Sequence, residues 1–346
     1  MRKLKIGMLG TLHDHSVGKL DCVRKFPDIF EIVGIVPDSD ERIAGYRAAG
    51  FNNFTFWTSA DLKAHPSFRD YPLLTEEQLM NAGCDFIMVE GFEYDLPFAA
   101  MRCVENGIPV HIDKPVGRDI KAFTDLLRLA KKKELPLQVA YMYRYNEAVL
   151  DCLRMVKSGE LGEILSCTAQ MNIEHPAEKR HWHGMFDYGN MFYIGCHMLD
   201  LIHLMQGMPR RITPYITSSG LDGNTSFDQG TAILEYPRGI SIAQSNGTEI
   251  NGYQHRQLVV SGSKGTYEIR PLEMKPSAII SRQGKGGEIK EFPLPSGRYD
   301  SMMLDFAAIV LGEKENPFDY GFELDTHRMA LAACGYDVDY TSEIGL

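Results

Sequence analysis

The chain has 346 residues, more than one typical domain needs and enough for two. Hydrophobic residues make up 44% of it and charged residues 24%, as is ordinary for a globular protein with buried cores. The formal net charge of -10 argues against nucleic acid or an anionic membrane as the main partner, because either would need a basic face.

The first 140 residues alternate short β-like runs with amphipathic helices, a pattern typical of a parallel α/β sheet. We expect strands at residues 5–9, 32–36, 86–89, 110–112 and 137–140, and helices at 15–26, 97–106 and 118–133. The helix at 118–133 is the clearest, because its apolar residues share one face and basic residues crowd its C-terminal end. Residues 1–140 are therefore predicted to form a Rossmann-type, dinucleotide-binding domain.

The pattern changes after residue 141. A helix is expected at 147–158, followed by strands at 164–171, 231–236, 240–246, 258–261, 266–269 and 278–281, with further helices at 301–311 and 323–338. Successive strands joined by short turns favour an antiparallel sheet. Residues 141–346 are therefore predicted to form an α+β domain with an open, largely antiparallel sheet.

The stretch from Gly10 to His15 joins the first expected strand to the first helix. That junction binds pyrophosphate in doubly wound folds, because N–H groups at the helix N-terminus face the anion. If Gly10 is the first glycine of a GxGxxG motif, Leu12 and His15 occupy the other two glycine positions. An ordinary strand-to-helix turn is an equally good interpretation of this segment.

An acidic residue at the end of the second strand would bind the adenine ribose hydroxyls and select NAD over NADP. Pro37 occupies the first position for it and Asp38 the next, so Asp38 takes this role if the turn is shifted by one residue. No adjacent Ser-Arg pair invites a 2′-phosphate, and NAD is therefore favoured.

Lys114 lies in an Asp-Lys-Pro turn at the end of the strand 110–112. At the C-terminal edge of a parallel sheet it would point into the crevice where ligands bind. Its ammonium group could hydrogen-bond a substrate hydroxyl and lower the pKa of that hydroxyl as hydride leaves. The alternative is a solvated Lys-Pro turn without a catalytic role.

A second candidate lies on an apolar helix that is expected to start at Tyr193. Tyr193, His197 and Asp200 are spaced four and three residues apart and would share one stripe of this helix. His197 could move the hydroxyl proton, since imidazole titrates near neutrality. The alternative is a hydrogen-bonded histidine of the core.

Residues 175–192 are rich in aromatic side chains and histidines, which suits a sugar-like ligand. Trp182 and His183 lie at the centre of this segment. His181, His183 and His197 could in principle bind a metal, but no ligand spacing supports it, and we expect no metal site.

Together these features resemble the Gfo/Idh/MocA family of NAD(P)-dependent oxidoreductases, typified by glucose–fructose oxidoreductase and inositol dehydrogenase. The motifs lie at residues 110–115, 143–146, 158–164, 195–200 and 261–266, and their order and spacing carry the resemblance. The resemblance implies hydride transfer between a nicotinamide and a carbinol carbon of a sugar or cyclitol. It implies that Lys114 contacts substrate and nicotinamide, and that His197 is the acid/base or its close partner. It also implies that the domain formed by residues 141–346 binds the substrate and carries the oligomerisation interface.

The chain departs from the family pattern at three points. Glycines are missing at 12 and 15, Asp113 replaces the usual glutamate, and Tyr193 stands where the family commonly has aspartate, four residues before the histidine. Tyrosine can donate a hydrogen bond and, with a lowered pKa, act as a base, but it holds no permanent negative charge.

The predicted site residues are Lys114, His197 and Tyr193 for catalysis, Gly10, Thr11, Leu12, His13, Asp38, Glu90, Asp113 and Lys114 for NAD or NADP, and Arg144, Trp182, His183 and Asp200 for the substrate. The leading hypothesis is a dehydrogenase acting on CH–OH groups. One alternative is a lyase or hydrolase that oxidises a sugar transiently with retained NAD. Another is a nucleotide-sensing regulator without catalysis.

The remaining expectations concern location and assembly. Seven scattered cysteines without a CxxC pair predict free thiols in a reducing compartment. No stretch approaches the roughly 18 apolar residues that a membrane helix needs, and the apolar run at 6–9 is too short for a signal peptide. We expect a soluble, cytoplasmic homo-oligomer, a dimer or tetramer, with no nucleic-acid or membrane partner.

Overall fold

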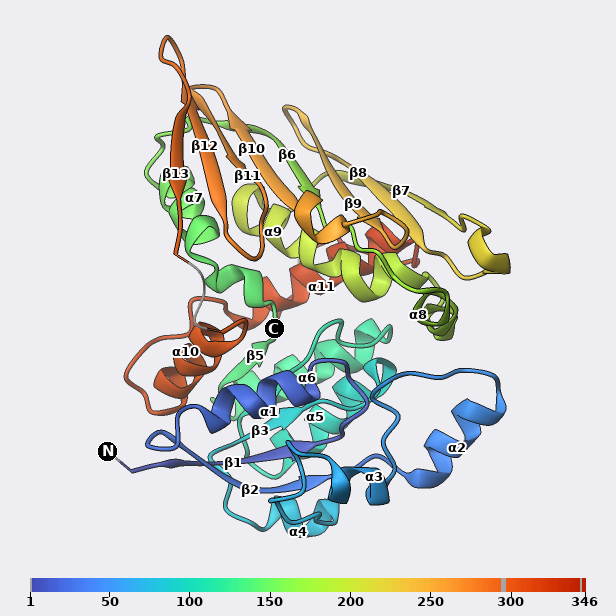
Figure 1. The fold of residues 1–346 in the computed structure, drawn as a ribbon. Coiled ribbons are helices and arrows are strands. Elements are labelled where there is room, and N and C mark those ends of the chain that lie inside the picture. Colours follow the sequence, from blue (N-terminus) through green and yellow to red (C-terminus); the bar gives the residue numbers. More distant parts are fainter. Residues whose placement is uncertain (1, 294–296, 343) are drawn as a thin grey trace. The chain divides into compact units, whose positions relative to one another are not determined.

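The computed structural model describes residues 2–293, 297–342 and 344–346 (Figure 1). These residues form two compact units. The first comprises residues 2–140, 297–324 and 344–346, and the second comprises residues 141–293 and 325–342. Each unit is built around its own sheet.

The first unit contains a five-stranded sheet in the order β2-β1-β3-β4-β5, in which all neighbouring strands are parallel. The chain starts in the interior strand β1, moves to β2 on one side and crosses to β3 on the other. The carboxyl ends of β1 and β3 therefore form a topological switch point, where ligands of such sheets bind. The strands are β1 (Leu4–Leu9), β2 (Phe30–Val36), β3 (Phe86–Val89), β4 (Val110–Ile112) and β5 (Leu137–Val139).

Helices flank this sheet (Figure 1). They are α1 (Ser16–Arg24), α2 (Asp40–Ala48), α3 (Ser59–Ala64), α4 (Glu76–Met80), η1 (Glu93–Asp95), α5 (Leu96–Glu105), α6 (Ile120–Lys132) and α10 (Asp300–Val310). The predicted helix at 118–133 is α6. The Asp119 side chain caps it by accepting a hydrogen bond from the Ala122 N–H, and its buried face includes Phe123 and Leu127.

The second unit contains an eight-stranded sheet in the order β13-β12-β11-β10-β6-β9-β8-β7. Only the β6–β9 pair is parallel among these described strands, so the predicted open, largely antiparallel sheet is confirmed. The strands are β6 (Ile164–Gln170), β7 (Arg211–Thr217), β8 (Gln229–Glu235), β9 (Ile240–Asn246), β10 (Gln257–Gly262), β11 (Gly265–Ile269), β12 (Ser277–Arg282) and β13 (Glu288–Glu291).

One face of this sheet is covered by helix α9 (Cys196–Gln206), which packs on β6 and β9 (Figure 1). The strands alternate buried and exposed residues accordingly, as in β8 and β9. The other helical segments are η2 (Met142–Tyr145), α7 (Glu147–Lys157), α8 (Ala177–Trp182), η3 (His183–Met185), η4 (Met191–Gly195), η5 (Leu221–Gly223), η6 (Gly252–His255) and α11 (Tyr320–Cys334).

The observed units differ from the predicted division at residue 140 in one respect. Residues 297–324 and 344–346 pack with the first unit, although the sequence assigned them to the second. The contacts are specific: Lys25 Nζ lies 2.9 Å from Asp300 Oδ1, and the Asn316 side chain donates to the Leu137 carbonyl at 3.1 Å. The chain therefore returns to the first sheet after completing the second.

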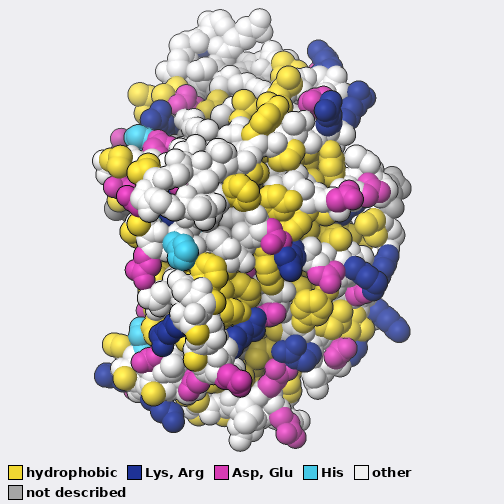
Figure 2. Space-filling model, turned by 90° about the vertical axis from the view of Figure 1, so that its right-hand side faces the viewer, with side chains coloured by type: hydrophobic (Ala, Val, Ile, Leu, Met, Phe, Trp, Pro, Cys, Tyr) yellow, Lys and Arg dark blue, Asp and Glu magenta, His cyan; other side chains and the backbone are white. Residues whose placement is uncertain are grey.

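Two further surface properties bear on function. No helix among the described residues is long and apolar enough to cross a membrane. On the face drawn in Figure 2, acidic and basic side chains are interspersed with hydrophobic ones, so neither sign of charge gathers there.

Candidate functional site

The loop that follows β1 makes a backbone-to-backbone contact with the loop that follows β3. Gly10 has a φ of +84°, and a Cβ at this position would lie 2.4 Å from Gly91 Cα. Only glycine tolerates both the left-handed conformation and this approach. The glycine predicted for the tight turn is therefore required, whereas its partner Gly91 carried no signal in the sequence.

Asp38 closes the same loop from the end of β2. Its Oδ2 accepts hydrogen bonds from the N–H groups of Thr11 at 2.7 Å and Leu12 at 3.1 Å. Burial raises the pKa of the Asp38 carboxyl above its usual value, although these two N–H groups favour its ionised form. Three predicted cofactor residues thus lie together, with the carboxylate holding the loop.

A buried ion-pair network lies at the ends of β1, β3 and β4. Lys19 Nζ, on α1, is 2.7 Å from Glu90 Oε1 and 2.6 Å from Asp113 Oδ2, and all three side chains are fully buried. Burial raises the pKa of Glu90 well above its usual value, and Lys19 offsets this only in part. Burial also acts to raise the pKa of Asp113, but the adjacent Lys19 ammonium favours the ionised carboxylate, and this pKa lies well below its usual value.

Two histidines of the β1–α1 loop complete this network. His13 Nδ1 and His15 Nδ1 each lie 3.2 Å from Asp113 Oδ2. Burial lowers the pKa of His13 well below its ordinary value and that of His15 to about 4, so both imidazoles are neutral at pH 7. Possible metal-ligating atoms of His13, His15 and Asp113 all lie within 4.8 Å of one another.

The three histidines that the sequence analysis considered as metal ligands do not come together in this way. In the part of the chain that the structure describes, His181, His183 and His197 form no group of three ligand atoms within this distance.

Lys114 is fully buried rather than solvated. Its N–H donates to Asp113 Oδ1 at 2.7 Å, and its carbonyl oxygen accepts from His13 Nε2 at 2.9 Å. The backbone of the Asp-Lys-Pro turn is therefore fixed from both sides, by its own aspartate and by the β1–α1 loop.

In the second unit, His197 lies on α9 and its ring meets two tyrosines edge-on. The ring centroids of Tyr141 and Tyr143 are 5.8 and 5.1 Å from that of His197. One turn further along α9, Asp200 Oδ1 accepts from Arg144 Nε at 2.8 Å and lies 2.7 Å from Arg144 Nη2. The two predicted substrate residues Arg144 and Asp200 therefore bind each other in the core.

Tyr193 lies in a π-helical turn, η4, and α9 begins only at Cys196. The Tyr193 ring stacks on Phe186 with a centroid separation of 5.4 Å and meets Trp182 and His183 at 5.0 and 5.2 Å. The helix therefore begins later than expected, and the four-residue spacing from Tyr193 to His197 spans a wider turn than an α-helix has. Tyr193, Trp182 and His183 form one buried aromatic cluster.

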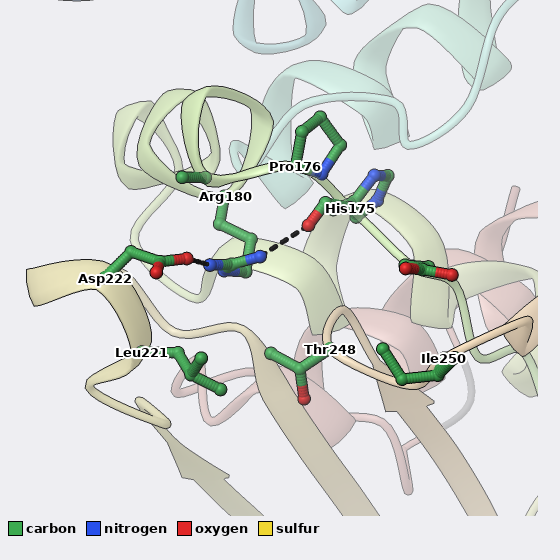
Figure 3. A pocket seen from close by; sticks show the side chains of 9 residues that line it. His175, Pro176, Arg180, Leu221, Asp222, Thr248 and Ile250 are labelled. Atoms are coloured by element: carbon green, nitrogen blue, oxygen red, sulfur yellow. Dashed lines mark hydrogen bonds and ion pairs between the residues drawn. The ribbon is translucent and has the colours of Figure 1, made fainter.

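A pocket of about 420 Å³ opens beside this cluster (Figure 3), within the size range of small-molecule sites. Arg180 forms one wall, where its guanidinium pairs with Asp222 and donates to the His175 carbonyl oxygen. Thr248 and Ile250 lie across from it in Figure 3. The lining residues are Glu174, His175, Pro176, Ala177, Arg180, Leu221, Asp222, Thr248 and Ile250.

The sequence pointed to part of this pocket only. Residues 175–180 belong to the histidine-rich segment singled out above, but no motif marks residues 221–222 and 248–250. The lining combines a guanidinium, an imidazole, carboxylates and a hydroxyl with apolar side chains, which suits a small polar ligand.

Comparison with known proteins supports this picture. Residues 149–268 match the family model described as GFO/IDH/MocA C-terminal domain. The 2,7-anhydro-N-acetylneuraminate hydratase of Escherichia coli K12 is 25% identical over 198 residues, 56% of this chain and 52% of the relative. The scyllo-inositol 2-dehydrogenase (NADP(+)) IolW of Bacillus subtilis 168 is 24% identical over 155 residues, 42% of this chain and 43% of the relative. The chain spans about half the length of the curated relatives it matches.

Solved structures extend the likeness to nearly the whole chain. An oxidoreductase from Agrobacterium radiobacter, in complex with NAD+, L-tartaric acid and magnesium, matches 96% of this chain and 95% of its own with a TM-score of 0.76. At 13% sequence identity this likeness shows the fold alone. The resemblance to the Gfo/Idh/MocA family predicted from the motifs is thereby confirmed, and it is carried by residues 149–268, which match the model of that family's C-terminal domain.

Proposed function

We propose that the protein is an NAD(P)-dependent oxidoreductase that transfers hydride to or from a carbinol carbon of a sugar, cyclitol or related polyol. The observation that carries this proposal is the β1–α1 loop: Asp38 binds its N–H groups, and Gly10 brings it against Gly91. A close glycine turn after the first strand and an acidic residue after the second strand are the features expected of a dinucleotide crevice. The dehydrogenase and NAD-bound relatives support the same activity.

The described residues fit a dinucleotide at this edge of the sheet. Both hydrogen bonds that Asp38 accepts end on Oδ2, and among the described residues Oδ1 accepts none, so a ribose hydroxyl can use Oδ1. A carboxylate beside the ribose disfavours a 2′-phosphate, which supports NAD over NADP. Thr11, Leu12, His13, Glu90 and Asp113 would line the remaining crevice.

When bound, the nicotinamide supplies the acceptor or donor of hydride. We assign Lys114 to the substrate oxygen, where its ammonium stabilises negative charge as the hydroxyl proton leaves. His197 holds or returns that proton, and Tyr193 assists it. Arg144 and Asp200 act by fixing α9 to the segment that follows β5, because their side chains bind each other.

The pocket beside the aromatic cluster is our candidate for polyol recognition. Glu174 and Thr248 offer a carboxylate and a hydroxyl to sugar hydroxyls, and Ile250 offers an apolar surface to C–H groups. Trp182 and His183 support this region from the core.

One observation favours a second candidate function. The relative with 25% identity is a hydratase, so it is named for addition or removal of water rather than for net oxidation. A reaction that oxidises a sugar transiently and restores the cofactor would use the same residues. Net accumulation of NADH supports the dehydrogenase, whereas a dehydrated or hydrated product with catalytic NAD supports the alternative.

The first experiment is thermal unfolding with NAD, NADH, NADP and NADPH added separately. A ligand at 100 times its Kd stabilises the fold by about 2.7 kcal/mol, an easily measured shift. A shift with one cofactor justifies a screen of sugars and polyols with it. No shift with any of the four, in protein free of copurified nucleotide, would refute the proposal.

The residue roles are tested with the substrate found in that screen. Lys114→Met and His197→Ala should lower kcat by about 10²-fold or more, the usual size of acid–base effects. Lys132→Ala, on the exposed end of α6, is the matched control and should retain wild-type kcat. Near wild-type kcat in both site variants would contradict the assignment. Tyr193→Phe tests the assisting hydroxyl in the same assay.

Two further proposals concern assembly and location. Ile242, Ile279 and Ile289 lie on one row across the outer face of the eight-stranded sheet, and they are 39%, 42% and 71% exposed. A second copy that covered this row would remove apolar surface from water, so the row is our candidate interface for a dimer or tetramer. All seven cysteines are free thiols, which supports a reducing, cytoplasmic location.

A further inference from the structure

We propose that His13, His15 and Asp113 bind a divalent transition-metal ion at the ends of β1 and β4. This site goes beyond hydride transfer and adds an electrophile to the same edge of the sheet. Neither its spacing nor its sequence context marks it: two histidines stand two residues apart, and the aspartate follows about a hundred residues later.

The distances suit one ion. His13 Nδ1 and His15 Nδ1 are each 3.2 Å from Asp113 Oδ2. Two ligand atoms bound to one tetrahedral zinc ion at the usual bond lengths are roughly 3.3 Å apart. The remaining pair of ligand atoms belongs to His13 and His15, and these lie within 4.8 Å of each other. The His15 side chain is 13% accessible, and a small movement of its ring would shorten this distance to the zinc value.

The tautomer of His13 is fixed by its neighbours. Its Nε2 faces the carbonyl oxygen of Lys114 at 2.9 Å, and a carbonyl can only accept, so Nε2 carries the proton. Its Nδ1 accepts the N–H of His15 at 3.1 Å, so this nitrogen holds a lone pair. Asp113 Oδ2 lies 3.2 Å from this nitrogen, and an ion between the two atoms would take the place of the His15 N–H on the lone pair.

The groups that would orient the metal ligands are already in place. Metal-binding histidines commonly donate their other N–H to a backbone carbonyl, as His13 does to Lys114. Asp113 is itself held by the Lys114 N–H at 2.7 Å and by Lys19 Nζ at 2.6 Å. Both neighbours orient the carboxylate before any ion arrives.

The Lys19 ammonium would repel a cation, but it is shared. Glu90 Oε1 lies 2.7 Å from Lys19 Nζ, so two carboxylates face one ammonium in this network. An ion on Asp113 Oδ2 would therefore leave Lys19 with Glu90 as its second partner.

The ligand set selects the metal class. Two imidazoles and one carboxylate suit zinc, cobalt or iron, whereas magnesium and calcium prefer oxygen alone. Three protein ligands leave coordination positions for solvent or a substrate oxygen, as catalytic rather than structural zinc sites do.

The test measures metal content without nucleotide or substrate, so failure of the oxidoreductase proposal leaves its result unchanged. The full chain is stripped with chelator, supplied with Zn²⁺, Co²⁺ or Mg²⁺, dialysed and analysed by mass spectrometry. We expect about one zinc ion per wild-type chain, visible d–d bands with cobalt and no retained magnesium. His15→Gln and Asp113→Asn should bind zinc at least tenfold more weakly, roughly the cost of losing a metal-site interaction.

Two controls keep the result decisive. His181→Gln removes an exposed histidine of the other unit and should bind as wild type does, which excludes surface binding. His15 is partly exposed, so His15→Gln should fold even if Asp113→Asn does not, and circular dichroism checks both. Zinc bound equally by wild type and His15→Gln, or no stoichiometric binding by the wild type, would overturn the proposal.

Discussion

The guanidinium of Arg144 lies 2.7 Å from the carboxylate of Asp200, and neither side chain reaches solvent. The sequence indicated that both residues bind substrate. Their mutual pairing instead ties the loop after β5 to α9, which carries His197. We propose that this buried pair fixes the position of the helix.

Removing one partner of this pair should lower the stability of the fold. Arg144→Met or Asp200→Leu alone leaves an uncompensated buried charge and should destabilise the fold by about 3–5 kcal/mol. The double variant Arg144→Met/Asp200→Leu should be clearly more stable than the sum of the singles implies. Urea unfolding of the four proteins measures this coupling.

An exposed ion pair serves as the control for this comparison of single and double variants. Lys121 and Asp125 form an i,i+4 pair on the surface of α6, and removing either should leave the unfolding midpoint unchanged. Additive effects of the Arg144 and Asp200 variants would show that the two residues act independently.

The close approach of Gly10 to Gly91 gives a second prediction. In Gly10→Ala the alanine must adopt a left-handed conformation, which costs about 1–2 kcal/mol. Its Cβ would also lie 2.4 Å from Gly91 Cα, too close for two carbon atoms. Gly107→Ala is the matched control, because Gly107 has a φ of +78° with nothing within 4 Å of its Cβ position. Thermal unfolding should show Gly10→Ala to be the more destabilised, with weaker NAD binding. Equal losses of stability in the two variants would mean that the loop moves to accommodate the added Cβ.

Much of the fold follows from local sequence. Every strand of the first sheet was predicted, because parallel strands buried on both faces read as short apolar runs. The edge strands β7 and β13 were not predicted: Pro214 interrupts the first, and the second is exposed throughout, so neither shows a core pattern. Helix α2 was missed for a similar reason, since Ile43 is its one buried residue.

The site was predicted less completely, and the reason is distance along the chain. Lys19 reads as a surface residue of α1, yet folding places it between Glu90 and Asp113, which follow two other strands. No local pattern marks such a meeting. The π-helical turn before α9 was equally hidden, because Tyr193 lies at ordinary helical spacing from His197 in the sequence.

The buried His203 gives a pH prediction. Burial lowers its pKa from the ordinary 6.5 to about 4, while its Nδ1 lies 2.7 Å from Thr326 Oγ1. Between these pH values the unfolded chain binds the proton and the folded chain does not. The unfolding free energy should therefore rise with pH across this window, by up to about 1.4 kcal/mol per pH unit for one residue.

The variant His203→Gln isolates this contribution. Glutamine does not titrate, so the slope of unfolding free energy between pH 4 and 6.5 should be smaller in His203→Gln than in the wild type. Urea unfolding at half-unit pH steps measures the slope. An unchanged slope in His203→Gln would show that this histidine keeps an ordinary pKa in the folded protein.

The outer row of the eight-stranded sheet gives the last prediction. Ile279 pairs with Ile289 across strands and both are exposed, so Ile279→Asp should place a charge in the proposed subunit interface. Leu150→Asp is the control: α7 packs on the opposite face, where Asp151 accepts from the buried Tyr267 hydroxyl, and Leu150 itself is exposed. Light scattering should give an oligomer for the wild type and Leu150→Asp, and a smaller species for Ile279→Asp. A monomeric wild type, or an Ile279→Asp variant of unchanged mass, would mean that this face does not join the subunits.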